Sequence, residues 1–297
     1  MYKRQIGNVG DITLRALDVL STVDVILAED TRRTRLLLSL VLPNPRQVPA
    51  QILSCHEHNA RDRVPSVISA LESRRSVALV SDAGTPCLSD PGLPVVRAVT
   101  AAGFQVVPVP GASALLAALV VSGTALDAFT FFGFLPRSGS ARTAALQKVV
   151  STSHAIAMYE APHRLVASLK DLADAFEAVD DSSRTICVCR ELTKKYETVR
   201  SFDSITAAVH HFSEDEEPRG EFVLIIGPKP TVKKMDFGDI ASSSVSMGAV
   251  AEELLAEGVS VKTISKVLSS CTAMSKKPLY NYLIDLKDKE KVSAPGE

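Results

Sequence analysis

Short apolar runs alternate with amphipathic segments through the first 121 residues, and this alternation constrains the fold more than any other feature of the sequence. Residues 23–28, 77–81 and 104–109 have the apolar composition of buried strands. Asp11 is the predicted N-cap of a helix with leucines on one face. Strands joined in turn by helices build a largely parallel sheet covered on both faces. We therefore predict an α/β domain with further helices over residues 63–73, 91–102 and 112–121.

A second series of strands and helices begins after Gly123. Its first strand is the aromatic run at residues 129–134. The pattern predicts further strands at 155–159, 185–190 and 222–226, and helices at 165–176 and 204–212. We accordingly divide the chain into an α/β domain at 1–124, a second α/β domain at 125–229, a polar linker at 230–246 and a small helical appendage at 247–287.

Composition places the chain among ordinary globular proteins, with 46% hydrophobic and 23% charged residues in 297. The longest apolar candidate, residues 112–122, is too short to cross a membrane, and no signal peptide opens the sequence. We expect no membrane contact and a cytoplasmic location. The five cysteines have no CxxC spacing, so we expect reduced thiols, with Cys187 and Cys189 both in the core.

The net charge of −1 provides no general attraction for nucleic acid. Any contact with RNA must therefore be local. The candidates are the cluster Arg32, Arg33 and Arg35 and the pair that begins at Lys194. Each of these is also compatible with a solvated surface that has no partner.

The stretch SDAGTPCLSDPG, residues 81–92, follows a predicted strand and is unusually dense in glycine, proline and aspartate. Gly84 permits a positive φ, and Asp90 before Pro91 predicts an N-cap with proline at the first helical position. A second glycine turn, residues 110–114, follows another predicted strand. Ligands of open α/β sheets bind at such strand ends, although a turn without a ligand also fits the pattern. Neither GxGxxG nor GxxxxGK[ST] occurs, so we expect a compact, phosphate-poor ligand.

The stretch from Cys55 to His58 groups three residue types that bind metals. Adjacent side chains in a strand or turn point apart, and no second pair with zinc spacing follows. We therefore predict no metal site there.

Eight sequence blocks lie in order between Ile6 and Gly227: IGNVGDITLRALDVL, AEDTRRT, HEHN, SDAGTPCLSDPG, VPGASA, GFLP, YEAPHR and RELTKKYE. Together they resemble the 16S rRNA (cytidine-2′-O) ribose methyltransferases of the tetrapyrrole methylase superfamily. The resemblance implies two α/β domains with S-adenosylmethionine (SAM) in the cleft between them, a homodimer, and a helix-turn-helix-like tail. The implied substrate is a cytidine in the decoding region of 16S rRNA, in the small ribosomal subunit.

The same resemblance implies which loops hold the methyl donor. In the superfamily, the loops that match those after the two predicted strands line the SAM cleft, and HEHN lies in a loop near the cleft or the dimer seam. The residues implied to bind SAM are Gly84, Thr85, Pro86, Ser89, Asp90, Pro110, Gly111, Ala112, Ser113 and Ala114.

Transfer of a methyl group to a ribose hydroxyl needs aligned reactants and a group that accepts the proton or stabilises the alkoxide. Asp30 and Glu160 follow predicted strands, and Arg164 is a cationic partner. We name these three as catalytic candidates without assigning the base, and Arg32, Arg33, Arg35 and Lys194 as RNA contacts. Glu160 and Arg164 also have the spacing of an ion pair at a helix start.

The chain departs from the family pattern at its beginning. Family members open with an apolar strand that ends in Thr-Pro, whereas this chain has Met1-Tyr2-Lys3-Arg4-Gln5 before the first block. We expect the N-terminal sheet to lack that strand and one wall of the SAM cleft. Two alternatives stay open: a superfamily methylase that acts on a tetrapyrrole or a modified histidine, and an RNA-binding scaffold that binds no SAM.

Overall fold

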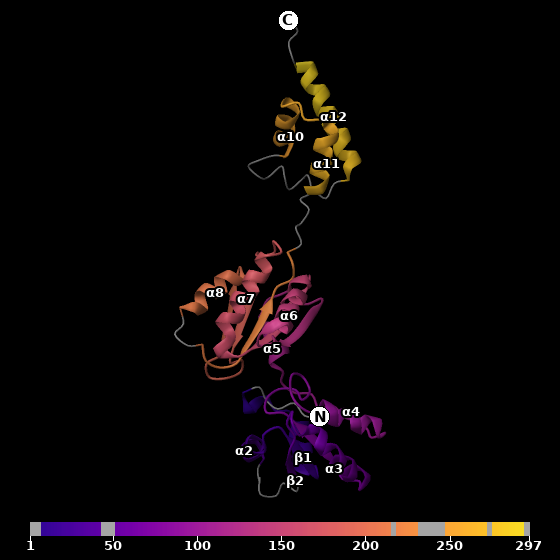
Figure 1. Ribbon diagram of the computed structural model, residues 1–297, viewed down its shortest axis with the longest axis vertical. Helices are drawn as coiled ribbons and strands as arrows, with labels where there is room; N and C mark the ends of the chain where they lie inside the picture. The colour runs from indigo at the N-terminus through magenta and orange to yellow at the C-terminus, as the bar shows by residue number, and fades with distance from the viewer. Residues whose placement is uncertain (1–6, 43–50, 215–217, 231–246, 272–274, 294–297) are drawn as a thin grey trace. The chain divides into compact units, whose positions relative to one another are not determined.

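The computed structural model describes residues 7–42, 51–214, 218–230, 247–271 and 275–293 (Figure 1). The chain forms two compact units, Met1–Lys229 and Pro230–Glu297. Residues 1–6 and nearly all of the predicted linker lie outside the described residues, so the expectation of a missing first strand stays a prediction.

Two sheets organise the first unit, confirming the predicted α/β class. The elements before the second sheet are η1 (Val9–Asp11), α1 (Leu14–Thr22), β1 (Val25–Ala28), α2 (Thr31–Val41), β2 (Gln51–Ser54), α3 (Ala60–Glu72), β3 (Val77–Val80), α4 (Leu93–Ala101) and α5 (Ala114–Val121). The second series comprises β4 (Phe129–Phe134), α6 (Gly139–Ser151), β5 (Ala155–Glu160), η3 (Pro162–Arg164), α7 (Leu165–Glu177), β6 (Ile186–Arg190), β7 (Thr198–Phe202), α8 (Ile205–Ser213) and β8 (Phe222–Ile226).

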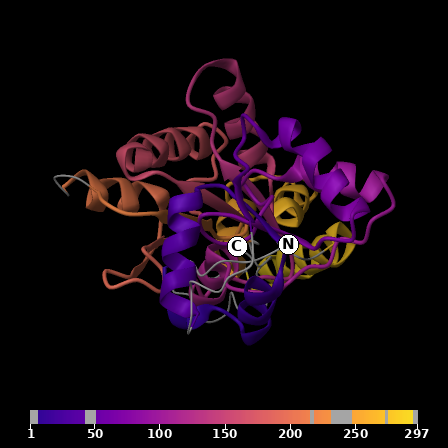
Figure 2. The same ribbon diagram turned by 90° about the horizontal axis from the view of Figure 1, so that it is seen from below.

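The first sheet is parallel, with strand order β2-β1-β3. Alternate residues of β1 face opposite layers because side chains in a strand alternate between faces. Val25 and Leu27 pack in one cluster with residues of α3 and α4, which lie side by side in both views (Figure 1, Figure 2). Ile26 and Ala28 pack in the other with residues of α1 and α2. Because helices cover both faces of this sheet, its open sides are the two ends of the strands, where the loops lie.

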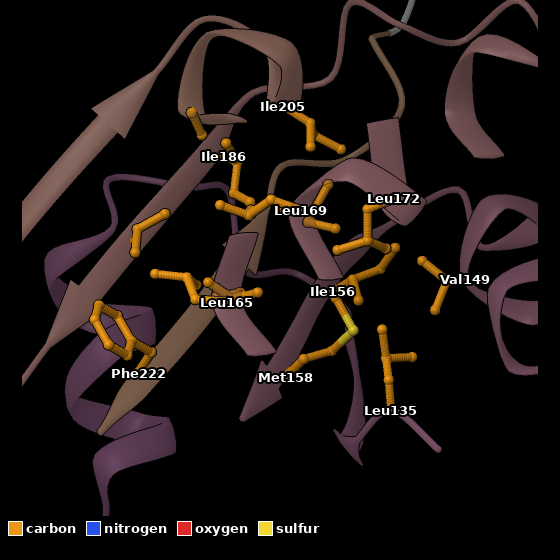
Figure 3. Packing of buried hydrophobic residues seen from close by; sticks show 14 of the residues in the cluster. Leu135, Val149, Ile156, Met158, Leu165, Leu169, Leu172, Ile186, Ile205 and Phe222 are labelled. Carbon is orange, nitrogen blue, oxygen red and sulfur yellow. The ribbon is translucent and has the colours of Figure 1, made fainter. Parts of the chain in front are cut away.

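The second sheet has the order β4-β5-β8-β6-β7, with β4 and β5 parallel and the remaining pairs antiparallel. One face is covered by α6, α7 and α8. Figure 3 shows leucines of α7 against Ile156, Met158 and Ile186 of the strands. The other face packs against α5 and includes Cys187 and Cys189, which confirms that both thiols are in the core. This core fixes the strand ends of the second sheet beside those of the first.

Three local predictions are wrong. Residues 104–108 form no strand, and Val109 makes only a single bridge. Phe104 and Val106 instead pack into the cluster on one face of the first sheet, and Val109 packs into the cluster on the other, which explains their apolar character without a ladder. The N-cap of α1 is Thr13 rather than Asp11, because the Thr13 hydroxyl accepts from the Ala16 amide.

Helix α4 also begins later than predicted. Its N-cap is Gly92, at a φ of 123°, rather than Asp90. A Cβ at this glycine would lie 2.5 Å from Leu79 Cδ2, so the loop crosses β3 too closely for another residue. This displacement frees Asp90 from capping and leaves it in the loop.

The described residues of the second unit form three helices: α10 (Met247–Ala256), α11 (Val261–Cys271) and α12 (Lys276–Ser293). Ala251, Ile264, Leu268, Leu279 and Leu283 form its core. The predicted helical appendage therefore forms a core of its own. Within the part of the chain that the structure describes, no helix has both the length and the apolar character needed to cross a bilayer.

Candidate active site

A cavity of about 270 Å³ lies at the ends of strands from both sheets, and we refer to it as the donor cavity. The loop after β3 forms one wall. The start of α5, the ends of β4 and β5 and the start of β8 form the rest. Its lining residues are Ala83, Gly84, Thr85, Leu88, Ser89, Asp90, Ala114, Phe134, Tyr159, Glu160, Ala161, Pro162, Glu221, Phe222 and Val223.

The loop after β3 has an unusual backbone. Gly84 has a φ of 71°, which confirms the positive φ expected at this glycine. Cys87 and Ser89 also have positive φ values, 67° and 62°, although neither is glycine. Such conformations cost energy and persist where surrounding packing enforces them, often at functional sites. The loop therefore has a more strained backbone than a simple chain reversal requires.

The structure brings together half of the residues predicted to hold SAM. Gly84, Thr85, Ser89, Asp90 and Ala114 line the donor cavity. Pro86 is outside its lining, and so is the run from Pro110 to Ser113. Val109 makes only a single bridge, so residues 110–113 do not follow a strand as predicted. Only the first residue of α5, Ala114, reaches the cavity.

Two aromatic residues of the lining were not identified from the sequence. Phe134 and Tyr159 face each other with ring centroids 5.6 Å apart, and Phe131 lies 5.0 Å from the Tyr159 ring. Both residues belong to quoted blocks, GFLP and YEAPHR, but we interpreted them only as apolar residues of predicted strands. The donor cavity thus combines small residues on one side with aromatic surface on the other.

The lining fits a nucleoside-containing methyl donor such as SAM. The Thr85 hydroxyl is buried and has no hydrogen-bond partner, so it is available to a polar ligand. Ala83, Gly84 and Ala114 leave room for a close approach, and the aromatic rings offer faces on which a purine can stack.

Glu160 lines the donor cavity and pairs with Arg164, whereas Arg164 itself lies outside the lining. Glu160 is 2% exposed and accepts hydrogen bonds from the Ser168 hydroxyl and, at 2.8 Å, from the Ala161 amide. Arg164 lies 3.5 Å from the Glu160 carboxylate and donates to the Leu135 carbonyl. These contacts hold η3 against β4 and β5, a bracing arrangement.

Asp30 lies outside the donor cavity, at the N-terminus of α2. Its carboxylate accepts from the Arg32 amide at 2.8 Å and pairs with the Arg32 guanidinium at 2.9 Å. Hydrogen bonds from Arg32 lower the pKa of Asp30 to about 2. The Asp30 carboxylate therefore remains charged at neutral pH and caps the helix.

The predicted RNA contacts divide into two groups. Arg32 and Arg33 are well exposed on α2, and Arg33 lies 3.4 Å from the Asp82 carboxylate. Arg35 is exposed one turn further along the helix. Lys194 instead bridges two carboxylates, Glu191 at 2.7 Å and Glu221 at 2.9 Å, and is only one-quarter exposed. The α2 arginines are thus more accessible to a large anionic partner than Lys194.

Asp90 has the most perturbed carboxyl group of the cavity wall. Burial raises the pKa of Asp90 to about 7, and the neighbouring Glu29 carboxylate adds to the rise. Asp82 and Glu221 act in the same direction, whereas a hydrogen bond with Ser81 opposes it. A carboxyl group with this pKa exchanges protons near neutral pH.

Comparison with solved structures supports the fold. The methyltransferase CobJ superposes with a TM-score of 0.56 at 16% identity, over 79% of this chain and 94% of that one. A uroporphyrin-III C-methyltransferase from Thermus thermophilus, complexed with S-adenosylhomocysteine, gives a TM-score of 0.51 at 19% identity, covering 75% and 94%. These likenesses show that the chain shares the fold of these solved structures.

Residues 6–205 match the family model described as tetrapyrrole (corrin/porphyrin) methylases. The chain belongs to this family. A protein from Synechocystis sp. named ribosomal RNA small subunit methyltransferase I is 38% identical over 95% of both chains. One of the same name from Pseudomonas aeruginosa is 43% identical over 74% of this chain and 75% of its own.

Proposed function

We propose that this protein uses SAM to methylate the ribose 2′-hydroxyl of a cytidine in the decoding region of 16S rRNA, within the small ribosomal subunit. Similarity to relatives named ribosomal RNA small subunit methyltransferase I, over nearly the whole length of both chains, carries the proposal. We further propose that the protein acts as a homodimer in the cytoplasm.

The donor cavity supports the use of SAM. Bound there, SAM supplies an activated methyl group. The Thr85 hydroxyl and the backbone around Gly84 would hold its polar groups, while Phe134 and Tyr159 would contact its adenine. Glu160 and Arg164 brace this wall, and the exposed arginines of α2 would contact RNA phosphates.

A pair of glycine variants tests the donor site. Gly84→Arg places a long side chain at the cavity wall and should weaken SAM binding by at least about 100-fold, measured by isothermal titration calorimetry. Gly103→Arg is the matched control, since Gly103 has a similar φ of 82° and open space around it. Equal SAM affinity in the two variants would place the donor elsewhere.

The acceptor is tested with purified small ribosomal subunits that lack the modification. Labelled methyl groups should enter 16S rRNA and map to a cytidine ribose. Transfer to a uroporphyrinogen-type ring and not to rRNA would favour the tetrapyrrole alternative. The absence of SAM binding by wild-type protein would favour the scaffold.

A further inference from the structure

A second cavity, of about 600 Å³, lies beside the donor cavity, and we refer to it as the outer cavity. Its walls come from the end of β1, the loop after β2 and the turn that leads into α4. Ser89 and Asp90 belong to the linings of both cavities, so the two spaces meet at these residues. A methyl donor in one and an acceptor in the other would be separated only by this pair.

The loop after β2 gives the outer cavity two aromatic rings. His56 and His58 are exposed in its lining, with ring centroids 6.1 Å apart and planes at 65°. Asn59 fixes this loop, because its side chain accepts from the His56 amide at 2.7 Å and donates to the Ser54 carbonyl. Histidine rings held in place are surfaces on which an unstacked nucleobase can lie.

The polar groups of the outer cavity suit a nucleoside better than a phosphate. Glu29, Glu57 and Asp90 contribute carboxyl groups, and the described residues of the lining include no lysine or arginine. Carboxylates accept hydrogen bonds from the exocyclic amine of cytosine and from ribose hydroxyls, whereas they repel phosphates. Arg32 is exposed on α2, which begins two residues after Glu29 of the lining. The phosphate of a flipped-out nucleotide would remain outside the outer cavity, near Arg32.

We infer that the outer cavity receives the acceptor nucleoside, its base against His56 and His58 and its 2′-hydroxyl toward the Asp90 carboxylate, which accepts the hydroxyl proton. The inference rests on the proposed function. In the transfer, the bond between the ribose oxygen and the methyl carbon forms as the sulfur–methyl bond breaks. The positive charge on sulfur is neutralised, and the proton passes from the hydroxyl to Asp90.

The groups around Asp90 fit this role. Burial raises the pKa of Asp90 most, the neighbouring Glu29, Asp82 and Glu221 carboxylates raise it further, and a hydrogen bond with Ser81 lowers it. The Cys87 thiol and the Tyr159 hydroxyl lie near enough to sense its charge. The result, a pKa of about 7, gives a base that is available at neutral pH and strong enough to assist a weakly acidic hydroxyl.

The first test is direct binding of the full-length protein to unmodified small subunits, without SAM. His58→Ala should weaken this binding about tenfold, as expected for loss of one stacking contact. His210→Ala, an exposed histidine on α8, is the matched control and should bind as wild type does. SAM affinity should stay within twofold of wild type in both variants. Equal subunit binding by both variants would overturn the nucleoside site.

The second test is steady-state methylation at saturating SAM. Asp90→Asn should lower kcat by about 10²- to 10⁴-fold and abolish the rise of kcat with pH through 7 that wild type should show. Circular dichroism and thermal unfolding would confirm that the variant folds. An Asp90→Asn enzyme with wild-type kcat would overturn the role of Asp90. A wild-type protein that binds SAM but methylates no rRNA would instead overturn the proposed function and, with it, this inference.

Discussion

The two walls of the donor cavity hold carboxyl groups in opposite settings. In the wall built on the second sheet, Glu160 is buried but accepts hydrogen bonds from a hydroxyl and an amide and lies beside a guanidinium. In the wall built on the first sheet, Asp90 lies among other carboxylates, and its pKa rises to about 7. The comparison separates a carboxylate that supports structure from one that can exchange a proton.

The largest effect should come from removing the supported carboxylate. Glu160→Ala removes the carboxylate that pairs with Arg164 and accepts from the Ser168 hydroxyl and the Ala161 amide, and should lower the free energy of unfolding by about 3–5 kcal/mol. Chemical denaturation would measure it, with the exposed Glu177→Ala at the end of α7 as control. A variant as stable as the control but inactive would give Glu160 a role in the reaction and break the comparison.

A smaller effect of opposite sign is expected at Asp90. Because the folded state raises this pKa from 3.8 to about 7, ionisation of Asp90 costs stability as the pH rises through that interval. Asp90→Asn removes the charge, and should raise Tm at pH 8 by about 2–4 °C. The gain should fade toward pH 4, where the wild-type carboxyl is protonated. Thermal unfolding across this range measures it, and a Tm below wild type at pH 8 would contradict the raised pKa.

The smallest effect is expected at Asp30, which is partly buried at the N-terminus of α2. Its pKa is lowered from 3.8 to about 2, so its contribution to stability is present above pH 4 and lost as the pH falls toward 2. Asp30→Asn keeps a residue that caps helices well but removes the charge. Wild type should lose more Tm between pH 4 and 2 than the variant does. Parallel acid titrations that superimpose would show that the pair with Arg32 adds nothing.

Periodicity predicted the elements whose burial is regular. The strands β1, β3, β5, β6 and β8 are almost wholly buried, so an apolar run marks each of them. Strand β7 is largely exposed and no residue of β2 is fully buried, so neither has the apolar run that marks the others, and neither was predicted. Helix α2 has three arginines among its first five residues. We interpreted them as a charged cluster, so the helix that its buried leucines indicate was not predicted.

Local composition identified the loop of the candidate site but not the partners brought to it by the fold. The glycine and proline content of residues 81–92 marks a shaped loop whatever surrounds it. The burial of Asp90 depends on chain segments more than 50 residues away, including Glu29, and no local pattern reports it. Arg184 is a similar case, fully buried and donating to the carbonyls of Thr152, His154 and Gly227, against the usual exposure of arginine.

Helix α5 joins the donor cavity to the core of the second sheet. Ala114 at its start lines the cavity, and Leu115, Ala118 and Leu119 pack against β5, β6 and β8. A ligand that binds only the folded form at 100 times its Kd adds about 2.7 kcal/mol to stability. If α5 transmits that gain, the heat resistance of this protein and its lifetime against proteolysis would follow the supply of methyl donor in the cell.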